Sequence, residues 1–413
     1  QQQRNNNRGT PPQKNRDMNV LVLNCGSSSI KYQLLNMDAD AVLLAKGIVE
    51  KIGLTCGSFT YKPEGKEKVV IEQPIADHSV GMDLILKALV DPQHGVLKSL
   101  NEINAVGHRV AHGGEYFSES VRVTEDAKAK IKALGEIAPL HNPANLKGIE
   151  TMEKLLPSVP QVAVFDTSFH QTLPKKAFIY GIPYEYYQKY GIRRYGFHGT
   201  SHKFVAEKAC RLLGWDIAEK KIITCHLGNG ASISAVKGGK SIDTSMGFTP
   251  VAGLVMGTRA GDLDLGAFLY ICEKEGLNLE QANALVNKQS GVQGISGVSS
   301  DFRELTAAME AGNERAALAL DVFVYNVKKY IGAYAAAMNG VDLIIFTGGI
   351  GENDQPVREA VCADMDYLGV KINNELNATI KSKDVVISTE DAKTKVMVIT
   401  TDEELVIAMD TMR

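Results

Sequence analysis

Residues 20–35 read VLVLNCGSSSIKYQLL, and this stretch indicates the fold class. The apolar strand Val20–Leu23 runs into a polar, glycine-containing turn at Asn24–Ser29, and a second strand begins at Ile30. The same plan returns far downstream, where residues 221–236 read KIITCHLGNGASISAV. Two such strand–turn–strand units, well separated along the chain, predict two domains built on one plan.

Outside these two hairpins, segments with a helical apolar period alternate with short apolar strands. Such alternation is typical of the α/β class. The expected helices are Val80–Val90, Ala144–Leu156, His202–Leu213, Ala316–Met338, Val357–Leu368 and Glu403–Met412, and the expected strands are Val162–Phe165, Val341–Thr347 and Val396–Thr400.

Length and composition agree with a globular protein of two domains. The chain has 413 residues, of which 44% are hydrophobic and 23% charged. A net charge of −3 gives no general attraction to nucleic acid or to an anionic membrane. No apolar run approaches the ~18 residues of a membrane span. Six widely spaced cysteines without zinc-ligand spacing favour free thiols in a reducing cytoplasm.

The first 17 residues differ in composition from the rest. Gln1–Asp17 is rich in Gln, Asn and Arg and lacks the apolar core of a secretory signal, although its few acids are also a feature of transit peptides. Because a strand begins directly after Met18, we expect this segment to be a leader that is disordered or was added for expression.

Three glycine-containing turns could cradle phosphate groups with backbone N–H donors. They are Asn24–Ser29, followed closely by Lys31, then His226–Gly230 and Gly348–Asn353. A plain serine-rich hairpin is the alternative for the first. The third follows a strand and precedes a helix, but it lacks the last glycine of a dinucleotide fingerprint and lies near the C-terminus, so a Rossmann dehydrogenase is disfavoured.

Four polar residues occupy loops or strand ends, where function is often placed on a rigid scaffold: Arg109, Asp166, His198 and Arg259. Taken singly, an ion pair or a solvated charge explains each arginine, and a hydrogen-bonded core histidine explains His198. Together with several phosphate cradles they favour phosphoryl transfer, in which positioning and charge neutralisation supply most of the catalysis.

Ten segments of the chain match the motifs of one known family, in the family's order. They are NCGSSSIK (24–31), GHRVAHGG (107–114), APLHNP (138–143), FDT (165–167), RYGFHGTSH (194–202), HLGNG (226–230), MGTR (256–259), DFR (301–303), FTGGIGEN (346–353) and EEL (403–405). From Met18 onward the chain thus resembles the acetokinase family, within the actin, sugar-kinase and heat-shock-ATPase superfamily.

The resemblance implies a two-domain actin-like ATPase fold with duplicated βββαβαβα-type domains and an active-site cleft between them. Residues 18–167 with the C-terminal helix 404–413 would form the first domain, and 168–403 the second, carrying most of the nucleotide site. The implied reaction is reversible, ATP-dependent phosphorylation of acetate to acetyl phosphate by direct in-line transfer. Mg²⁺, with Mn²⁺ as a substitute, a homodimer and a cytoplasmic location are also implied.

The resemblance also implies roles for individual residues. Catalysis would use Asp166, His198, Arg259, Arg109 and His141, and the carboxylate substrate would contact Arg109, Ala111, Leu140, Phe197 and Pro250. ATP would contact Lys31, His226, Leu227, Gly228, Asn229, Gly230, Asp301, Phe302, Arg303, Gly349, Ile350, Gly351, Glu352 and Asn353. Ser27 and Ser29 would form the phosphate loop, and Asn24 and Glu403 would hold the metal.

Simple chemistry supports these roles. A carboxylate acceptor is already ionised at pH 7, so the enzyme needs no strong base, and the difficulty is to bring one anion against another. Asp166 is therefore interpreted as an orienting or charge-balancing group. Two alternatives stay open: a kinase for propionate or another short-chain acid, and an actin-like or chaperone-like ATPase module. The chain departs from the usual family pattern at Cys25, Ala111, Leu265 and Asp402, and Ala111 bears on substrate size.

Overall fold

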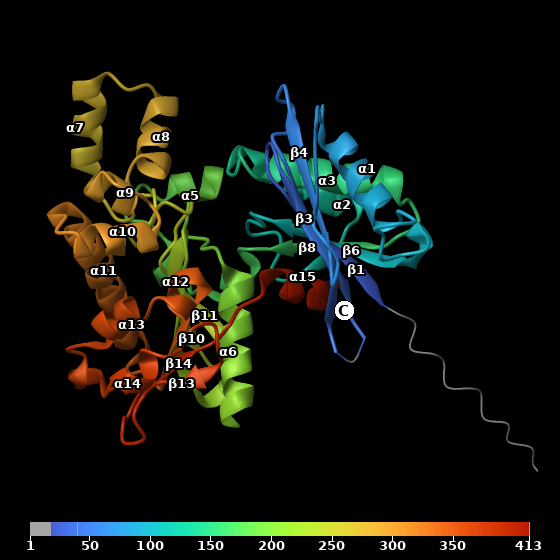
Figure 1. Ribbon diagram of the computed structural model, residues 1–413. Helices are drawn as coiled ribbons and strands as arrows, with labels where there is room; N and C mark the ends of the chain where they lie inside the picture. The colour runs from blue at the N-terminus through green and yellow to red at the C-terminus, as the bar shows by residue number, and fades with distance from the viewer. Residues whose placement is uncertain (1–17, 39, 413) are drawn as a thin grey trace, which may run out of the picture. The chain divides into compact units, whose positions relative to one another are not determined.

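The computed structural model describes residues 18–38 and 40–412 (Figure 1). The expectation for residues 1–17 therefore lies outside the described residues. The described chain divides into two compact units: unit 1 runs to Phe165 and resumes at Glu403, and unit 2 covers Asp166–Asp402. Among the helices of residues 18–38 and 40–412, none has the length and hydropathy that crossing a membrane requires.

Unit 1 contains one eight-stranded sheet, in the order β5-β4-β3-β2-β1-β6-β8-β7. Its strands are β1 (Asn19–Cys25), β2 (Ile30–Asn36), β3 (Val42–Glu50), β4 (Gly57–Pro63), β5 (Val69–Gln73), β6 (Ile103–Val110), β7 (Val121–Arg122) and β8 (Gln161–Phe165). Its α-helices are α1 (His78–Leu89), α2 (Glu125–Ala133), α3 (Asn142–Leu155) and α15 (Glu403–Thr411).

Unit 2 contains a six-stranded sheet, in the order β11-β10-β9-β12-β14-β13. Its strands are β9 (Lys221–Leu227), β10 (Ala231–Lys237), β11 (Lys240–Thr244), β12 (Leu343–Thr347), β13 (Val385–Val386) and β14 (Lys395–Val398). Its α-helices are α4 (Lys175–Phe178), α5 (Glu185–Tyr190), α6 (Gly199–Leu213), α7 (Leu265–Glu275), α8 (Leu279–Lys288), α9 (Gly291–Ser296), α10 (Phe302–Glu310), α11 (Glu314–Met338), α12 (Gly348–Asn353), α13 (Gln355–Cys362) and α14 (Asn374–Asn377).

The two sheets share a five-strand core with the same pairing. In unit 1 the order is β3-β2-β1-β6-β8, and in unit 2 it is β11-β10-β9-β12-β14. In both cores the first three strands pair antiparallel, and the last two continue parallel to the central strand. The predicted α/β class is confirmed, and the shared pairing is what a duplicated domain requires.

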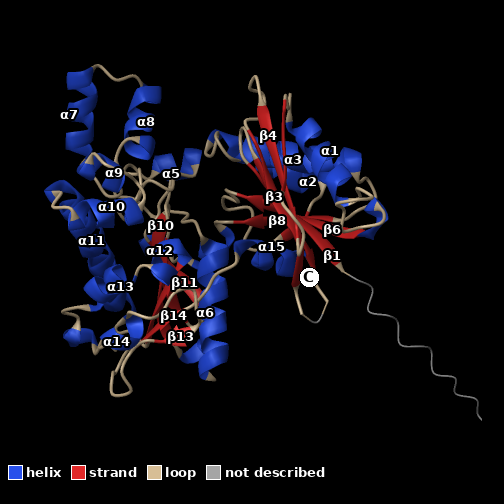
Figure 2. Cartoon of the chain, in the orientation of Figure 1, coloured by secondary structure: helices blue, strands red, loops and turns tan. Residues whose placement is uncertain are grey.

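Helices cover both faces of each sheet, as the secondary-structure colouring makes visible (Figure 2). In β1, Leu21 and Leu23 pack with Met82 of α1 and Met152 of α3. The alternate residues of β1 pack on the other face, against α15. Because successive side chains of a strand point to opposite faces, a strand covered on both faces is apolar throughout, which explains the unbroken run in β1.

Two local predictions are wrong. The segment Gly348–Asn353 is the helix α12 and not a tight turn. Gly348 makes this abrupt start possible, because its φ is +79° and a Cβ there would lie 2.6 Å from the Leu227 carbonyl oxygen. The helix expected over 357–368 ends at Cys362. Met365 is buried and continues the apolar period, but it lies outside the helix, directly after a turn that contains Asp364, whose φ is +55°.

Candidate active site

The turn between β9 and β10 collects three of the residues singled out from the sequence. His226, the penultimate residue of β9, stacks on His198 with ring centroids 4.2 Å apart. A Cβ placed on Gly230 would lie 3.2 Å from Arg259 Nη1 and 3.6 Å from His198 Nε2. The guanidinium and the imidazole therefore converge on the space above Gly230, which only a residue without a side chain leaves open.

Asp166 belongs to the same neighbourhood. It is buried directly after β8, and its carbonyl oxygen accepts a hydrogen bond from Gly199 N at 2.9 Å, at the start of α6. A Cβ on Gly199 would come within 2.6 Å of that oxygen. The close approach fixes the first turn of α6, and with it His198, against the segment that carries Asp166.

A cleft of about 860 Å³ lies within unit 2 and gathers eight of the residues expected to contact ATP. We call it the unit-2 cleft. The eight are Gly228, Asn229, Asp301, Phe302, Arg303, Gly349, Ile350 and Asn353. Gly349 has open space where a Cβ would project, so its backbone is accessible from the cleft. This volume is in the range that small-molecule sites occupy.

Several other expected ATP residues do not line this cleft. The Leu227 side chain is fully buried in the hydrophobic core, so only its backbone could meet a ligand. His226, Gly230, Gly351 and Glu352 lie on the same elements, β9 to β10 and α12, but outside the lining, and Lys31 belongs to unit 1.

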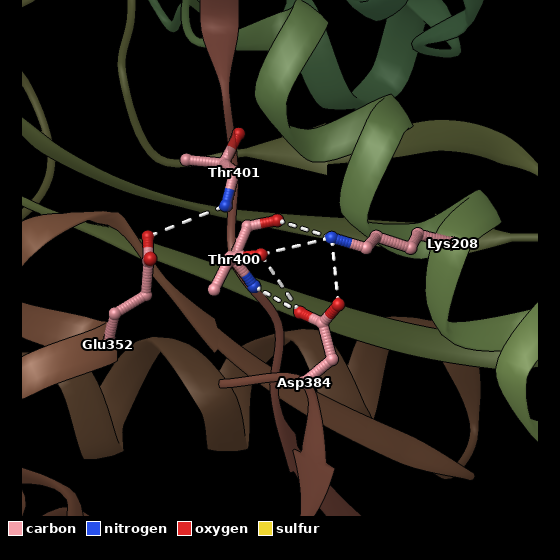
Figure 3. Close-up of polar contacts among 5 residues, drawn as sticks. All are labelled: Lys208, Glu352, Asp384, Thr400 and Thr401. Atoms are coloured by element: carbon pink, nitrogen blue, oxygen red, sulfur yellow. Dashed lines mark hydrogen bonds and ion pairs between the residues drawn. The ribbon is translucent and has the colours of Figure 1, made fainter. Parts of the chain in front are cut away.

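Glu352 instead connects α12 to the end of unit 2. Its carboxylate Oε2 accepts a hydrogen bond from Thr401 N at 3.5 Å, and burial raises the pKa of Glu352 (Figure 3). Next to it, Lys208 of α6 pairs with Asp384 at 2.9 Å and donates to the Thr400 carbonyl oxygen. The segment that leads toward Glu403 is thus bonded both to α6 and to the helix beside the cleft.

Two charged residues that line the cleft, Asp301 and Arg303, pair with each other. Arg303 Nη2 lies 3.0 Å from Asp301 Oδ2, and this hydrogen bond holds the pKa of Asp301 below its ordinary value. Asp301 also caps α10, since its Oδ1 accepts from Arg303 N at 2.8 Å. The Arg303 side chain is otherwise exposed, so it can turn toward a ligand at little cost.

Sequence reasoning missed six lining residues: Ser300, Thr306, Asp354, Gln355, Pro356 and Lys381. For Asp354 and Pro356 a signal existed, because an Asp with a Pro two residues later is typical of a helix start, and Asp354 does cap α13. No local pattern marks Lys381, which comes to the cleft only through the folding of the segment after α14.

Arg358 was also missed, and it holds this wall of the cleft together. It is fully buried in α13 and donates to three other segments. Its Nη1 lies 3.0 Å from the Gly351 carbonyl oxygen, and its Nε lies 2.8 Å from Asn377 Oδ1. Its Nη2 donates to the carbonyl oxygens of Asn377 and Ile380 at 3.1 and 2.6 Å. Arg358 thereby fixes α12 to the residue before Lys381.

In unit 1, the first turn is closed by a hydrogen bond from Gly26 N to the Ser29 carbonyl oxygen at 2.9 Å, and Ser27 is exposed. Asn24 pairs with Lys31 across β1 and β2. Lys31 Nζ in turn lies 3.3 Å from Glu404 Oε1, in the first turn of α15. The sequence-distant Asn24 and Glu403 are therefore brought to one end of the unit-1 sheet.

The residues expected around the carboxylate substrate divide between the units. Arg109 and Ala111 lie at the end of β6, where Ala111 N donates to Asn145 Oδ1 at 3.0 Å. Leu140 is 59% exposed, and His141 is exposed at the cap of α3. In unit 2, Phe197 is part of the core and Pro250 is half-buried.

The chain is similar to known proteins over almost its whole length. A model of the acetokinase family matches residues 19–409. Acetate kinase of Bacteroides thetaiotaomicron is 57% identical over 397 residues, covering 96% of this chain and 99% of the relative. Among solved structures, acetate kinase of Porphyromonas gingivalis has a TM-score of 0.93 at 51% identity, covering 96% of this chain and 99% of that one. A propionate kinase from Francisella tularensis has a TM-score of 0.88 at 42% identity, with the same coverage.

Proposed function

Because the chain belongs to the acetokinase family, we propose that it transfers the γ-phosphoryl group of ATP directly, in line, to the carboxylate of acetate, reversibly giving ADP and acetyl phosphate. The enzyme is a kinase, and ATP is its co-substrate. One observation carries the proposal. Gly228 and Asn229 line the unit-2 cleft, and the next residue, Gly230, faces Arg259 and His198. A nucleotide in the cleft would bring its phosphates to this turn.

The chemistry of a carboxylate acceptor fits these side chains. Since the acceptor is already an anion, its approach to the phosphate is opposed by charge, and groups that neutralise charge in the transition state contribute most. Arg259 and His198 would stabilise the migrating phosphoryl group, and Arg109 would hold the acetate carboxylate. Asp166 would orient these groups or balance their charge, and His141 would complete the site.

Mg²⁺ would be held by Asn24 and Glu403. Both offer oxygen atoms, and Mg²⁺ favours one or two carboxylates together with waters and phosphate oxygens. The pairing of Asn24 with Lys31, and of Lys31 with Glu404, supports their proximity. Within the described residues no three His, Cys, Asp or Glu gather as metal ligands, and a site with one carboxylate and one amide does not require such a group. The ion would neutralise phosphate charge, with Lys31, Ser27 and Ser29 contacting the phosphates.

A coupled assay for ADP, run against carboxylates of one to four carbons, tests the proposal. ADP release that depends on acetate is expected. Hydrolysis of ATP that does not respond to any carboxylate would instead indicate the chaperone-like ATPase module. A preference for propionate would favour the alternative of a propionate kinase. The similarity to a propionate kinase structure keeps this alternative open.

The width of the acyl pocket gives a prediction at Ala111. The family resemblance implies valine as the usual residue at this position, and alanine would remove two methyl carbons from the expected wall. A methylene in an apolar pocket is worth only ~1–3 kcal/mol of discrimination, so we expect useful activity with propionate and higher activity with acetate. Ala111→Val should lower kcat/KM for propionate and leave the acetate value within a few-fold. An equal loss for both substrates would show that position 111 does not face the acyl chain.

The metal assignment predicts different effects for two neighbouring glutamates. Glu403→Ala should raise the Mg²⁺ concentration needed for half-maximal activity, and should weaken binding of Mn²⁺ with nucleotide measured by paramagnetic relaxation. Glu404→Ala should change the Mg²⁺ requirement much less, because Glu404 pairs with Lys31 at 3.3 Å. Equal effects of the two variants would point to a general acidic patch.

A cytoplasmic homodimer completes the proposal. All six cysteines are free thiols, which suits a reducing compartment. Helix α7 has no buried residue, and Leu265, Leu269 and the nearby Leu279 of α8 are 74, 65 and 90% exposed. An apolar face of this kind is suited to pairing with a second copy of the chain.

A further inference from the structure

A chain of buried polar side chains runs inward from His198. His198 Nδ1 lies 2.9 Å from Ser232 Oγ, which lies 2.8 Å from His202 Nε2. His202 Nδ1 lies 2.6 Å from Thr224 Oγ1, and this hydroxyl donates to the Ser234 carbonyl oxygen at 3.4 Å. Ser232, His202 and Thr224 are fully buried, so each relies on its neighbours in the chain for hydrogen bonds.

The protons in this chain can be counted. Burial, together with the nearby His170 and His226, lowers the pKa of His202 well below its ordinary value, so the ring is neutral near pH 7. A neutral imidazole has one donor and one acceptor nitrogen, and a hydroxyl has one proton to donate. The hydrogen bonds that link His198, Ser232, His202 and Thr224 must therefore all point in the same direction.

The carbonyl of Ser234 sets that direction, because a carbonyl oxygen can only accept. Thr224 donates to it, so His202 Nδ1–H donates to Thr224, and His202 Nε2 must accept from Ser232. With its proton committed, Ser232 Oγ accepts from His198, and Nδ1 of His198 carries a proton.

We infer that Ser232 and His202 are positioning residues that keep the proton of His198 on Nδ1, so that His198 donates from Nε2 to the migrating phosphoryl group only as an imidazolium. The inference rests on the role given to His198 under the proposed function. In the neutral ring Nε2 presents a lone pair, which an anionic oxygen repels. Protonation of Nε2 supplies a donor and a full positive charge together.

The surroundings of His198 fit this assignment. Nε2 and Arg259 Nη1 both face the space above Gly230, so two cationic donors would point at one site. His226 stacks on the ring at 4.2 Å and His202 lies behind it, with the Asp166 segment bonded to the next residue, Gly199. His202 reaches Nδ1 through Ser232.

Unit 2 offers a matched control serine. Ser241 is also fully buried, and its Oγ lies 2.6 Å from Nδ1 of His170. His170 donates from Nε2 to the Phe197 carbonyl oxygen at 2.9 Å, and burial lowers its pKa to about 4. Ser241→Ala thus removes a hydroxyl from a buried neutral histidine in the same unit without touching the His198 ring.

Nitrogen NMR of the full chain, labelled with ¹⁵N-histidine, tests the inference directly. The His198 signals are identified by their loss in His198→Gln. At a pH where His198 is neutral, we expect a protonated Nδ1 and a bare Nε2. Ser232→Ala should move protons to Nε2, and Ser241→Ala should leave the His198 signals unchanged. A neutral wild-type ring protonated on Nε2 would overturn the inference.

Kinetics separate this inference from the proposed function. Ser232→Ala should lower kcat by roughly 10-fold, because the neutral ring protonated on Nε2 donates without the positive charge of the imidazolium and without the hydrogen bond to Ser232 that orients it. The loss should stay below the ~10²–10³ that complete loss of one transition-state donor costs. Its KM for ATP should stay within about two-fold, and Ser241→Ala should keep a near-normal kcat. A shifted tautomer with unchanged kcat would refute the catalytic part of the inference. A normal kcat in His198→Gln would instead refute the role of His198 in the proposed function, whatever the NMR result.

Discussion

An Arg259→Ala variant is expected to lose ~10³-fold or more in kcat, with a much smaller change in the KM for ATP. The guanidinium lies 3.2 Å from the Cβ position of Gly230, which is 3.6 Å from His198 Nε2. Gly230 directly follows Gly228 and Asn229, which line the unit-2 cleft. Under the proposed function the guanidinium would lie where charge moves during transfer and not where the adenosine would rest. Its loss should therefore act on the transition state more than on the bound nucleotide. Steady-state kinetics at saturating acetate and Mg²⁺ measure the changes in kcat and in the KM for ATP separately.

Arg303→Ala is the natural control for this prediction. Arg303 lines the cleft itself, is exposed, and pairs with Asp301 at 3.0 Å. Removing it should raise the KM for ATP by a few-fold and leave kcat within a few-fold of the wild-type value. If Arg259→Ala folds and keeps a near-normal kcat, Arg259 has no part in the mechanism. If the two variants behave alike, the cation above Gly230 acts only in binding.

The parts of the fold that the sequence predicted well depend on local pattern. The hairpins at β1–β2 and β9–β10 combine a buried strand with a polar turn, and the two halves repeat the plan. Apolar periodicity found α11 to its last residue, Met338. The same periodicity failed over 357–368, because a buried residue such as Met365 gives the same apolar signal from an irregular segment as from a helix.

Predictions for the site also succeeded where a local sequence pattern exists and failed where a residue depends on long-range contacts. Turn and motif residues such as Gly228, Asp301 and Gly349 do line one cleft, although up to about a third of the chain separates them. What the sequence did not indicate are residues that act through long-range contacts. Arg358 has no motif, and its partners Asn377 and Ile380 lie beyond the end of its helix. The Ser232–His202 chain likewise needs β10 and α6 side by side before its proton direction can be worked out.

Arg358→Met is expected to lower the free energy of unfolding of unit 2 by at least ~3 kcal/mol. The substitution keeps much of the side-chain volume but removes four donated hydrogen bonds, from Nε, Nη1 and Nη2, to buried oxygens of Gly351, Asn377 and Ile380. A buried acceptor left without its donor costs ~1–3 kcal/mol. The protein has a single tryptophan, Trp215, which lies in unit 2, so its fluorescence in a urea titration reports this unit separately.

Kinetics distinguish a local role of Arg358 from general destabilisation. Because Arg358 joins α12 to the residue before Lys381, its loss should loosen one wall of the unit-2 cleft and raise the KM for ATP while leaving the KM for acetate unchanged. Arg358→Lys keeps the charge but cannot reproduce the planar fork, so it should fall between wild type and Arg358→Met. Arg315→Met is the matched control, since Arg315 is exposed and its side chain donates to the Ile295 carbonyl oxygen at 2.9 Å. Equal urea midpoints for the Arg358 and Arg315 variants would show that the buried guanidinium does not hold the cleft wall.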